Sequence, residues 1–576
     1  MIKMTKSFLV LLAVLTIILL AISCSTNNSD ELIGDDTSIN ATEQTSLTIF
    51  ENGQYNCVIV IPHKAPADVE NTALSLALNM SKATSGISPS IVSDKEYEGK
   101  DTSGDNMILI GETTIKGTEE TFVNSKYGTV YAQLIGNKFQ VLVNDSKGAS
   151  YFIEKAKEIV GSTAVSSITI DESWNISETL DEAMSVIEIY DGGYVDKNIP
   201  CGDGSSMKII KSTSAEDYKA YIEKTKAVGG KIYSENQIGN NLFTTVKFDG
   251  YNATFVHLGN IKQSRLIMVP ADDFPLPELE EENVYTKVCS TSVTQLGVEG
   301  AGKQNGMSYI FKLADGRFAI IDGGHDTKKM PEILLNTLHD LAEDPSEITV
   351  AAWFITHPHD DHWGALLRIS ELEDNGGINI ERIVYNIPDD SFFDIAEARI
   401  MANELMAKHK ENGTKIYKAQ PGQVFHLADV DFTIYSTPDL YLPFSGTKVN
   451  NTSLIIRATV AGQSLLFPGD SAVEETASII DIYGESLKSD FLQVVHHGYG
   501  GADTKFYELV DPQILFWPVG LFDYYDRGIE DGGPVSKRPI NEYFFREEGT
   551  SLKEMYVAGE SVVTIPLPYD NVTKAD

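Results

Sequence analysis

The sequence predicts a mixed α/β protein with two small α/β domains followed by a larger α/β domain. The chain has 576 residues, and because domains usually hold about 100 to 200 residues, about three are expected. Strand-like and helix-like periodicities alternate along most of the chain. From Thr286 onward, short apolar runs end repeatedly in His, Asp or Gly, which places the polar chemistry of the last domain at strand ends.

The first 23 residues are predicted to be a secretion signal. Two lysines precede the apolar run 8–22, which is short for a membrane span of about 20 residues. Cys24 follows Leu-Ala-Ile-Ser, which resembles a bacterial lipoprotein signal, so we expect Cys24 to be lipidated and the body to lie at the extracellular face of the membrane. A plain signal peptide or a transmembrane anchor is the alternative. Residues 24–46 are polar and lack hydrophobic periodicity, which is typical of a flexible tether.

Residues 47–183 and 184–269 are predicted to form the two small α/β domains. The first combines strand-like runs with helical periodicity. Its outline resembles accessory domains found ahead of catalytic domains in some glycoside hydrolases, which implies carbohydrate contact. In the second, a helix is expected over 214–228, and we interpret the unit as a βαβ-like spacer or binding module. Three prolines and a group of acids predict an extended linker over 270–285.

Charge and cysteine content limit the partners. The chain has 45 Lys and Arg against 83 Asp and Glu, a formal net charge of −38. Duplex nucleic acid is not expected to bind, since its affinity for proteins comes largely from basic side chains that neutralise phosphates. Small molecules, or small groups linked to the cell wall, suit this charge better as substrates. Beyond Cys24 only Cys57, Cys201 and Cys289 remain, an odd and widely spaced set that predicts no disulfide framework.

A histidine-rich segment in the last domain predicts a metal site. Residues 356–364 read THPHDDHWG and hold three of the 11 histidines of the chain. In an extended turn, His357 and His359 are expected to point to one side. Asp361 and His362 are expected to turn to the other side, so that one short segment serves two metal ions.

This segment resembles the signature of the metallo-β-lactamase superfamily, and the other motifs of that family follow in order. Asp322, in the run IIDGG, matches the early aspartate that orients the metal loop. Asp470, in FPGD, matches the carboxylate that bridges both ions. The pair His496 and His497 matches the double-histidine form of a late motif. The resemblance implies an αββα sandwich over residues 286–576 and a hydrolase with a dinuclear metal site.

The resemblance also implies how the side chains divide their roles. The expected ligands are His357, His359 and Asp470 for one ion, and Asp361, His362, Asp470 and His496 for the other. Which histidine of the late pair is the ligand stays open, so His497 is a second candidate for it. The catalytic set is Asp361, His497 and Asp322, with His497 expected to bind a phosphoryl oxygen or protonate the leaving group. Zinc is the expected metal, and manganese or iron would also suit these ligands.

The region before Asp470 departs from the family pattern. Many members carry another histidine there, whereas this chain has Asn450-Asn451-Thr452-Ser453. In this respect the chain resembles the subgroup that contains the competence-type DNA-uptake hydrolases and the choline-phosphate esterases of teichoic acids. That likeness implies a phosphoester or phosphodiester hydrolase acting outside the cell, with Asn451 a weak ligand or a donor behind the ligands. The alternatives are a nuclease, a lactone, thioester or β-lactam hydrolase, and a non-catalytic wall-binding lipoprotein.

Three tyrosines and one histidine near these motifs are further candidates. Tyr499, Tyr524 and Tyr525 either pack in the domain core or line an aromatic pocket that holds a quaternary ammonium group by cation–π attraction. Among the isolated histidines, only His325 follows a metal motif closely, three residues after Asp322.

Overall fold

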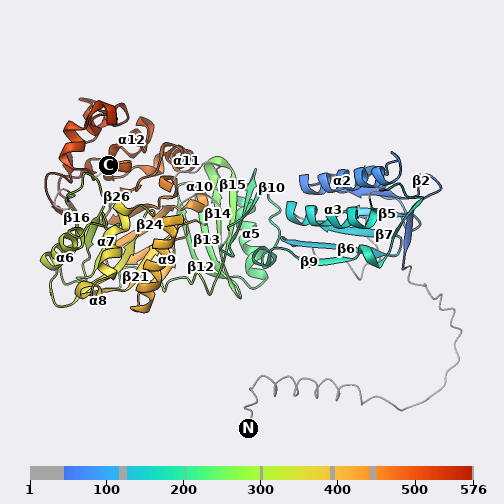
Figure 1. The fold of residues 1–576 in the computed structure, drawn as a ribbon, viewed down its shortest axis with the longest axis horizontal. Helices are drawn as coiled ribbons and strands as arrows, with labels where there is room; N and C mark the ends of the chain where they lie inside the picture. Colours follow the sequence, from blue (N-terminus) through green and yellow to red (C-terminus); the bar gives the residue numbers. More distant parts are fainter. Residues whose placement is uncertain are drawn as a thin grey trace, which may run out of the picture. The chain divides into compact units, whose positions relative to one another are not determined.

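The computed structural model describes residues 45–115, 126–143, 145–161, 163–201, 203–298, 302–388, 396–441 and 449–573. The predicted signal, the lipidation site Cys24 and nearly all of the predicted tether lie outside these residues. From Thr45 to Asp576 the chain forms one compact unit, in which three α/β regions follow one another (Figure 1). Within the described ranges, no helix combines the length and the apolar character needed to cross a membrane.

The first region is a six-stranded sheet with two long helices. The strand order is β4 (Ser90–Ser93), β3 (Val58–Ile61), β5 (Met107–Ile110), β7 (Lys138–Val143), β6 (Thr129–Ile135) and β9 (Ile176–Thr179). The helices α2 (Ala67–Ala83) and α3 (Ser146–Val160) run alongside each other, and their apolar side chains share a core with those of the sheet (Figure 1). A small sheet of β1 (Leu47–Glu51), β2 (Gln54–Tyr55) and β8 (Ser167–Ile170) completes this region, which is the α/β unit that the sequence predicts.

The second region differs from the expected βαβ-like unit. Its six strands are all paired antiparallel, in the order β10 (Tyr194–Pro200), β11 (Ser206–Lys211), β15 (Gln263–Pro270), β14 (Tyr251–Leu258), β13 (Asn241–Lys247) and β12 (Lys231–Ile238). The predicted helix is present as α5 (Ala215–Ala227), and Ser214 caps it through a capping box with Asp217. A βαβ unit needs parallel strands, so that interpretation was wrong.

The two faces of this antiparallel sheet have different neighbours. One face packs under α5 in a core that includes Tyr218, Ile222 and Phe255. Side chains of the other face, among them Phe243 and Val256, share a core with the last region. The Asn241 and Asn260 amides both donate to the carbonyl of Ile482, at 3.0 and 2.9 Å, in a helix of that region. The second region is therefore a packed support and not a free spacer.

The last region consists of two sheets packed face to face. The first has the order β22 (Lys415–Lys418), β21 (Arg382–Tyr385), β19 (Ile348–Phe354), β18 (Phe318–Ile321), β17 (Tyr309–Lys312), β16 (Ser292–Gln295) and β30 (Val563–Pro566), with β20 (Ile378–Ile380) also paired to β19. The second has the order β23 (Val424–Leu427), β24 (Val430–Ser436), β25 (Ile455–Val460), β26 (Gln463–Phe467), β27 (Phe491–Gln493), β28 (Ile514–Trp517) and β29 (Glu554–Val557). Between them lies an apolar core that includes Phe311, Phe432 and Phe467.

Helices cover the outer face of each sheet. The first sheet shares a core with α6 (Met330–Leu341), α7 (Asp360–Ser370) and α9 (Ala396–Glu411). The second shares a core with α11 (Val473–Tyr483) and α12 (Thr504–Val510). The layer order is thus helix, sheet, sheet, helix, which is the predicted αββα sandwich.

The predicted linker is irregular but held in place. Residues 271–285 contain no helix or strand. Glu280 nevertheless accepts from Arg317 and Arg382, with nitrogen–oxygen distances of 2.7 Å to each guanidinium. The segment is therefore attached to the first sheet of the sandwich.

The buried histidine His409 predicts an acid-sensitive fold. His409 in α9 is fully buried, and neither ring nitrogen makes a hydrogen bond of normal geometry among the described residues. Burial lowers its pKa to about 4, opposed by a backbone contact with Leu366 and assisted by the charge of Lys408. The unfolded chain, with a histidine pKa near 6.5, then binds more protons between pH 6.5 and 4, so stability is lost as the pH falls through that window, by at most about 3 kcal/mol.

Replacing this side chain by leucine should remove that loss. The His409→Leu variant is expected to melt at a higher temperature than the wild type at pH 5, with a smaller difference at pH 8, in thermal unfolding followed by circular dichroism. An equal difference at both pH values would show that the effect comes from packing alone.

Candidate metal centre

The candidate ligands lie at the ends of neighbouring strands on one side of the sandwich. The segment with His357 follows β19, Asp470 follows β26, and His497 follows β27. β26 and β27 are parallel, as are β18 and β19, so the loops after them emerge at the same sheet edge. This topology brings together side chains that are more than 100 residues apart in the sequence.

The histidine-rich segment changes from strand-like to helical backbone at His359. This residue is extended and immediately precedes α7, whose first turn holds Asp360 and Asp361. Carboxylates in a first turn are stabilised by the free N–H groups of a helix. His357 and His359 come from the extended part, and Asp361 and His362 from the helix, so the segment supplies two groups of ligands.

The first group consists of Asp361, His362, Asp470 and His497. One candidate ligand atom from each lies within 4.8 Å of the others, and all four residues are buried. Asp470 Oδ2 is 3.2 Å from His362 Nε2 and 3.3 Å from His497 Nε2. Asp361 Oδ2 is 3.2 Å from His497 Nε2. Two imidazole nitrogens and two carboxylates are a donor set that suits zinc and other divalent first-row metals.

The second group consists of His357, His359 and Asp470, again within 4.8 Å of one another. His357 Nε2 lies 4.0 Å from Asp470 Oδ2 and 2.9 Å from His359 Nδ1. Asp470 is therefore shared by both groups, as a bridging carboxylate must be. The structure brings together the side chains that the sequence assigned to two ions. The one difference is that His497, and not His496, lies in the first group.

That difference concerns His496 and His497. His497 is fully buried in the first group, whereas the side chain of His496 is 28% exposed and its Nε2 lies 3.9 Å from Asp470 Oδ2. His496 Nε2 also lies 3.0 Å from the Nδ2 amide of Asn450. From the sequence, His496 was the expected ligand and His497 a second candidate, with the choice left open. The geometry favours the alternative, with His497 as the ligand and His496 beside the site.

The rings of two candidate ligands are oriented by acceptors behind them. His362 Nδ1 lies 2.7 Å from Asp322 Oδ2, and His497 Nδ1 lies 2.7 Å from the carbonyl of Pro518. Each acceptor receives a hydrogen bond from the N–H at Nδ1. The ring therefore carries its proton on Nδ1, and the lone pair of Nε2 is directed into the site. Asp322 is fully buried and also accepts from the backbone N–H and the hydroxyl of Thr356, at 2.8 and 2.7 Å. It thus has the orienting position predicted for it.

Three buried polar atoms of the first group make no hydrogen bond of normal geometry. These are His362 Nε2, His497 Nε2 and Asp470 Oδ1 within the described part of the chain, although both nitrogens lie within 3.3 Å of a carboxylate oxygen. Buried polar atoms without a well-formed hydrogen bond are costly, so they indicate a ligand that would satisfy them. A divalent cation among them would satisfy all three at once, so the residues fit a metal ion.

The electrostatics of the group agree with this fit. Although burial alone would lower it, the pKa of His497 is raised to about 10 by Asp470 and Asp361. The same carboxylates and Asp322 raise the pKa of His362. Burial and the neighbouring His362 lower the pKa of His357, which keeps that ring neutral. The carboxylates that raise the pKa values of His362 and His497 favour positive charge in the site. They would equally attract a divalent cation in place of the protons.

The backbone is in the left-handed region at Asp322, His496 and His497, with φ values of 55°, 51° and 53°. Non-glycine residues adopt this conformation at a cost, and such residues concentrate at functional sites. Gly469, with φ of 58°, precedes Asp470, and a Cβ there would lie 3.0 Å from the Cβ of Thr356. The turn that presents Asp470 therefore requires glycine.

Two further polar residues lie behind the candidate ligands. Asn451 is buried, its Oδ1 accepts from the N–H of Ala472 at 3.0 Å, and its Nδ2 lies 3.3 Å from Tyr441 and Glu474. These contacts support the turn after Asp470 and favour the predicted role behind the ligands over that of a weak ligand. Thr356 was not predicted, although its position directly before the HxH pair is a usable signal.

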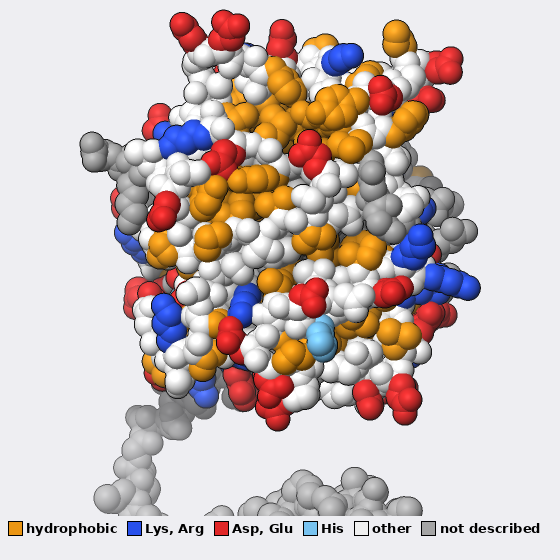
Figure 2. Space-filling model, turned by 90° about the vertical axis from the view of Figure 1, so that its left-hand side faces the viewer, with side chains coloured by type: hydrophobic (Ala, Val, Ile, Leu, Met, Phe, Trp, Pro, Cys, Tyr) orange, Lys and Arg blue, Asp and Glu red, His pale blue; other side chains and the backbone are white. Residues whose placement is uncertain are grey.

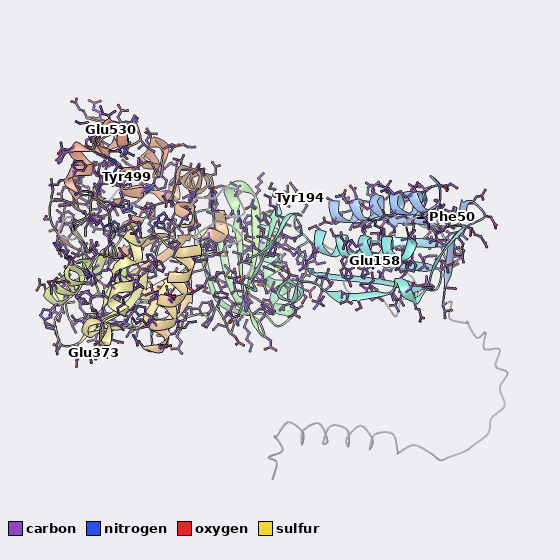
Figure 3. The ribbon with its side chains drawn as sticks, viewed as in Figure 1. Phe50, Glu158, Tyr194, Glu373, Tyr499 and Glu530 are labelled. Atoms are coloured by element: carbon purple, nitrogen blue, oxygen red, sulfur yellow. The ribbon has the colours of Figure 1, made fainter. Side chains whose placement is uncertain are left out.

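The predicted aromatic pocket is not formed by its tyrosines. The Tyr499 ring, labelled in Figure 3, already contacts the guanidinium groups of Arg527 and Arg538, at 5.0 and 5.4 Å from its centroid. Tyr524 is buried against Trp517, and Tyr525 is 52% exposed. These contacts favour the packing alternative for Tyr499 and Tyr524 over the quaternary ammonium pocket.

The family assignment rests on the match between these residues and known sequences. Residues 301–440 match the model of the metallo-beta-lactamase superfamily, a stretch that contains Asp322 and the segment from His357 to His362. This stretch of the chain is therefore similar to the metallo-beta-lactamase superfamily. The predicted αββα fold, and the prediction of an enzyme with this fold, are thereby confirmed at the level of the superfamily. No curated protein matches the sequence.

Two solved structures match about half of the chain at low sequence identity and with low TM-scores. CmlA, a diiron β-hydroxylase from Streptomyces venezuelae, is 12% identical, with a TM-score of 0.28 over 52% of this chain and 55% of that one. Yeast PDE1 is 14% identical, with a TM-score of 0.30 over 49% of this chain and 100% of that one. The chain thus spans little more than half of the length of CmlA.

Proposed function

We propose that the protein is a metal-dependent phosphodiesterase that acts on small or wall-linked substrates outside the cell. The observation that carries the proposal is the shared carboxylate: Asp470 belongs to both ligand groups, which is the arrangement of a dinuclear site. Paired divalent ions recur in enzymes that displace an oxygen at phosphorus, because they hold both the attacking and the leaving oxygen.

When bound, the two ions would lower the pKa of a water molecule and stabilise the charge that develops on the substrate oxygens. The protein supplies the geometry. Asp470 fixes the separation of the two ligand groups, and Asp322 and the Pro518 carbonyl hold the rings of His362 and His497 in the ligating tautomer. His496 is the partly exposed histidine beside Asp470, so we assign to it the contact with a substrate oxygen or with the leaving group.

The charge of the protein favours small substrates over long polyanions. The chain carries 38 more acidic than basic residues. On the end of the molecule formed by the metallo-beta-lactamase domain, basic side chains lie in small groups among acidic ones (Figure 2). Duplex DNA is bound through extended basic surfaces, so a nuclease function has little support from this face.

The test is turnover of bis(p-nitrophenyl) phosphate, a lactone and a chromogenic β-lactam by the purified chain from Thr45 onward, together with its metal content. We expect two equivalents of metal, cleavage of the phosphodiester, loss of turnover on treatment with a chelator, and recovery with zinc or manganese. Bound metal with cleavage of the lactone or β-lactam alone would replace the phosphoryl assignment by the carbonyl one.

The location is a separate part of the proposal. We infer lipidation at Cys24 from the signal sequence, with the body held at the outer face of the membrane. In cells, the wild type is expected in the membrane fraction and accessible to added protease, and the Cys24→Ser variant in the soluble fraction. Equal membrane association of both would instead indicate a transmembrane anchor.

A further inference from the structure

Two side chains outside the ligand groups form a hydrogen-bonded series behind Asp361. Asn305 Nδ2 donates to Asp361 Oδ2, the oxygen that also lies 3.2 Å from His497 Nε2. Asn305 Oδ1 lies 3.2 Å from His325 Nε2. One oxygen of this candidate ligand therefore faces the metal group on one side and an amide on the other.

The chemistry of the three groups determines which atom donates and which accepts in each hydrogen bond. Only the NH₂ of an asparagine can donate to a carboxylate, so the amide oxygen of Asn305 must face His325. His325 then carries a proton on Nε2 and donates it to that oxygen. The ring of His325 is 6% exposed, so it is held in the interior with little freedom to turn.

The backbone beside Asn305 supports the same ligand. Met307 N donates to the carbonyl of Asp361 at 3.0 Å. Asn305 itself forms an isolated β-bridge with Val519, the residue after Pro518. Because the Pro518 carbonyl accepts from His497 Nδ1, this one bridge connects the supports of two candidate ligands. The segment 305–307 thus holds Asp361 through both its backbone and its side chain.

We propose that Asn305 is the positioning residue for the metal ligand Asp361, and that His325 holds the Asn305 amide in place. The inference rests on the metal centre of the proposed function, but not on its substrate. Asp361 stands in the first turn of α7, where a carboxylate can adopt several rotamers. Fixing one rotamer before the ion binds removes an entropic cost of coordination, and partners behind a ligand are typically worth a 10- to 100-fold change in metal affinity.

A different role for His325 is less well supported. Its Nδ1 lies 3.6 Å from Asp360 Oδ2, and together with Asp326 these groups could surround a third cation. However, Arg368 already places a guanidinium nitrogen 3.3 Å from Asp326 Oδ2. A cation at that position would be repelled by the arginine, so we assign His325 to the support of Asn305.

The test is competition for zinc between a chromogenic chelator and four variants of the chain. Asn305→Ala is expected to weaken one of the two zinc sites by about 10- to 100-fold and to leave the other within about threefold. His325→Leu is expected to show a smaller loss at the same site, and His325→Gln, which keeps a donor, to restore much of it. Gln304→Ala removes the neighbouring amide, which accepts from the N–H of Phe522 and makes no hydrogen bond to a candidate ligand within the described residues, so both sites should keep their affinity.

Chelator competition needs no substrate, so a failed phosphodiester assay leaves this proposal standing. Unchanged affinity of both sites in Asn305→Ala would overturn it, as would a lower melting temperature of the metal-free variant without a change in affinity. A third equivalent of zinc that disappears in His325→Leu would also overturn it, since His325 would then be a ligand. At saturating metal, the proposed positioning role further requires that Asn305→Ala has a lower kcat than the wild type and little change in KM.

Discussion

Replacing Asp470 by alanine is expected to abolish binding of both metal ions and to lower kcat/KM by about 1,000-fold or more. The side chain belongs to both ligand groups, and its Oδ2 lies between 3.2 and 4.0 Å from nitrogens of three candidate ligands, His357, His362 and His497. Its removal takes a ligand from each ion at once. A 1,000-fold fall corresponds to about 4 kcal/mol of transition-state stabilisation, within the several kcal/mol that bound metals supply.

Two controls separate this effect from damage to the fold. Asp470→Asn keeps the shape of the side chain and removes its charge, so it should lose metal with little change in the melting temperature of the metal-free protein. Asp526→Ala removes an exposed carboxylate of the same domain and should keep both metal and activity. Elemental analysis with turnover of bis(p-nitrophenyl) phosphate gives both readouts. Retention of two metal equivalents by Asp470→Ala would show that Asp470 does not bridge the ions.

The position of the ligands could be predicted because the chemistry lies at strand ends. A run of apolar residues followed by His or Asp is visible in one sequence, as at His357 and Asp470. Parallel strands then carry such residues to one edge of a sheet. The histidine-rich segment was thus visible from its own residues, whereas Asp470 was predicted from the resemblance to the superfamily motifs.

The choice between His496 and His497 could not be predicted in the same way. Both residues have left-handed backbone, with φ of 51° and 53°, so the simple alternation of side chains along a strand does not apply to them. What separates them are contacts from distant segments, the Pro518 carbonyl behind His497 and the Asn450 amide beside His496. Asn305 was not predicted for the same reason, since it lies 56 positions before Asp361 in the sequence.

The second region shows the limit of periodicity for the fold. The sequence pattern located its helix correctly, but it says nothing about the direction in which strands pair. The antiparallel sheet leaves a second face to bury, and that face packs against the sandwich. The expected βαβ-like spacer or binding module is thus an antiparallel unit that shares a core with the sandwich.

Replacing Asp322 by asparagine is expected to lower kcat/KM by about 10- to 100-fold and to weaken zinc binding at the site of Asp361 and His362. In the wild type, Asp322 Oδ1 accepts from the N–H of Thr356, and Oδ2 accepts from the Thr356 hydroxyl and from His362 Nδ1. An asparagine that keeps its oxygen toward the Thr356 N–H turns its NH₂ toward His362. That ring must then accept at Nδ1 and carry its proton on Nε2, the atom that should bind the ion.

The tautomer can be measured directly, which makes this prediction independent of the substrate. Nitrogen NMR of labelled His362 should show Nδ1 protonated in the zinc-loaded wild type and a mixture or the reverse in Asp322→Asn. Asp322→Ala is expected to be worse in a different way, because it leaves the buried N–H of Thr356 without an acceptor, at a cost of about 1 to 3 kcal/mol in stability. A loss of stability in both variants with an unchanged tautomer and unchanged zinc affinity in Asp322→Asn would mean that Asp322 braces the loop and does not orient the ligand. The opposite pattern, a stable Asp322→Asn protein with the wrong tautomer and weak zinc binding, would assign the loss to one misplaced proton.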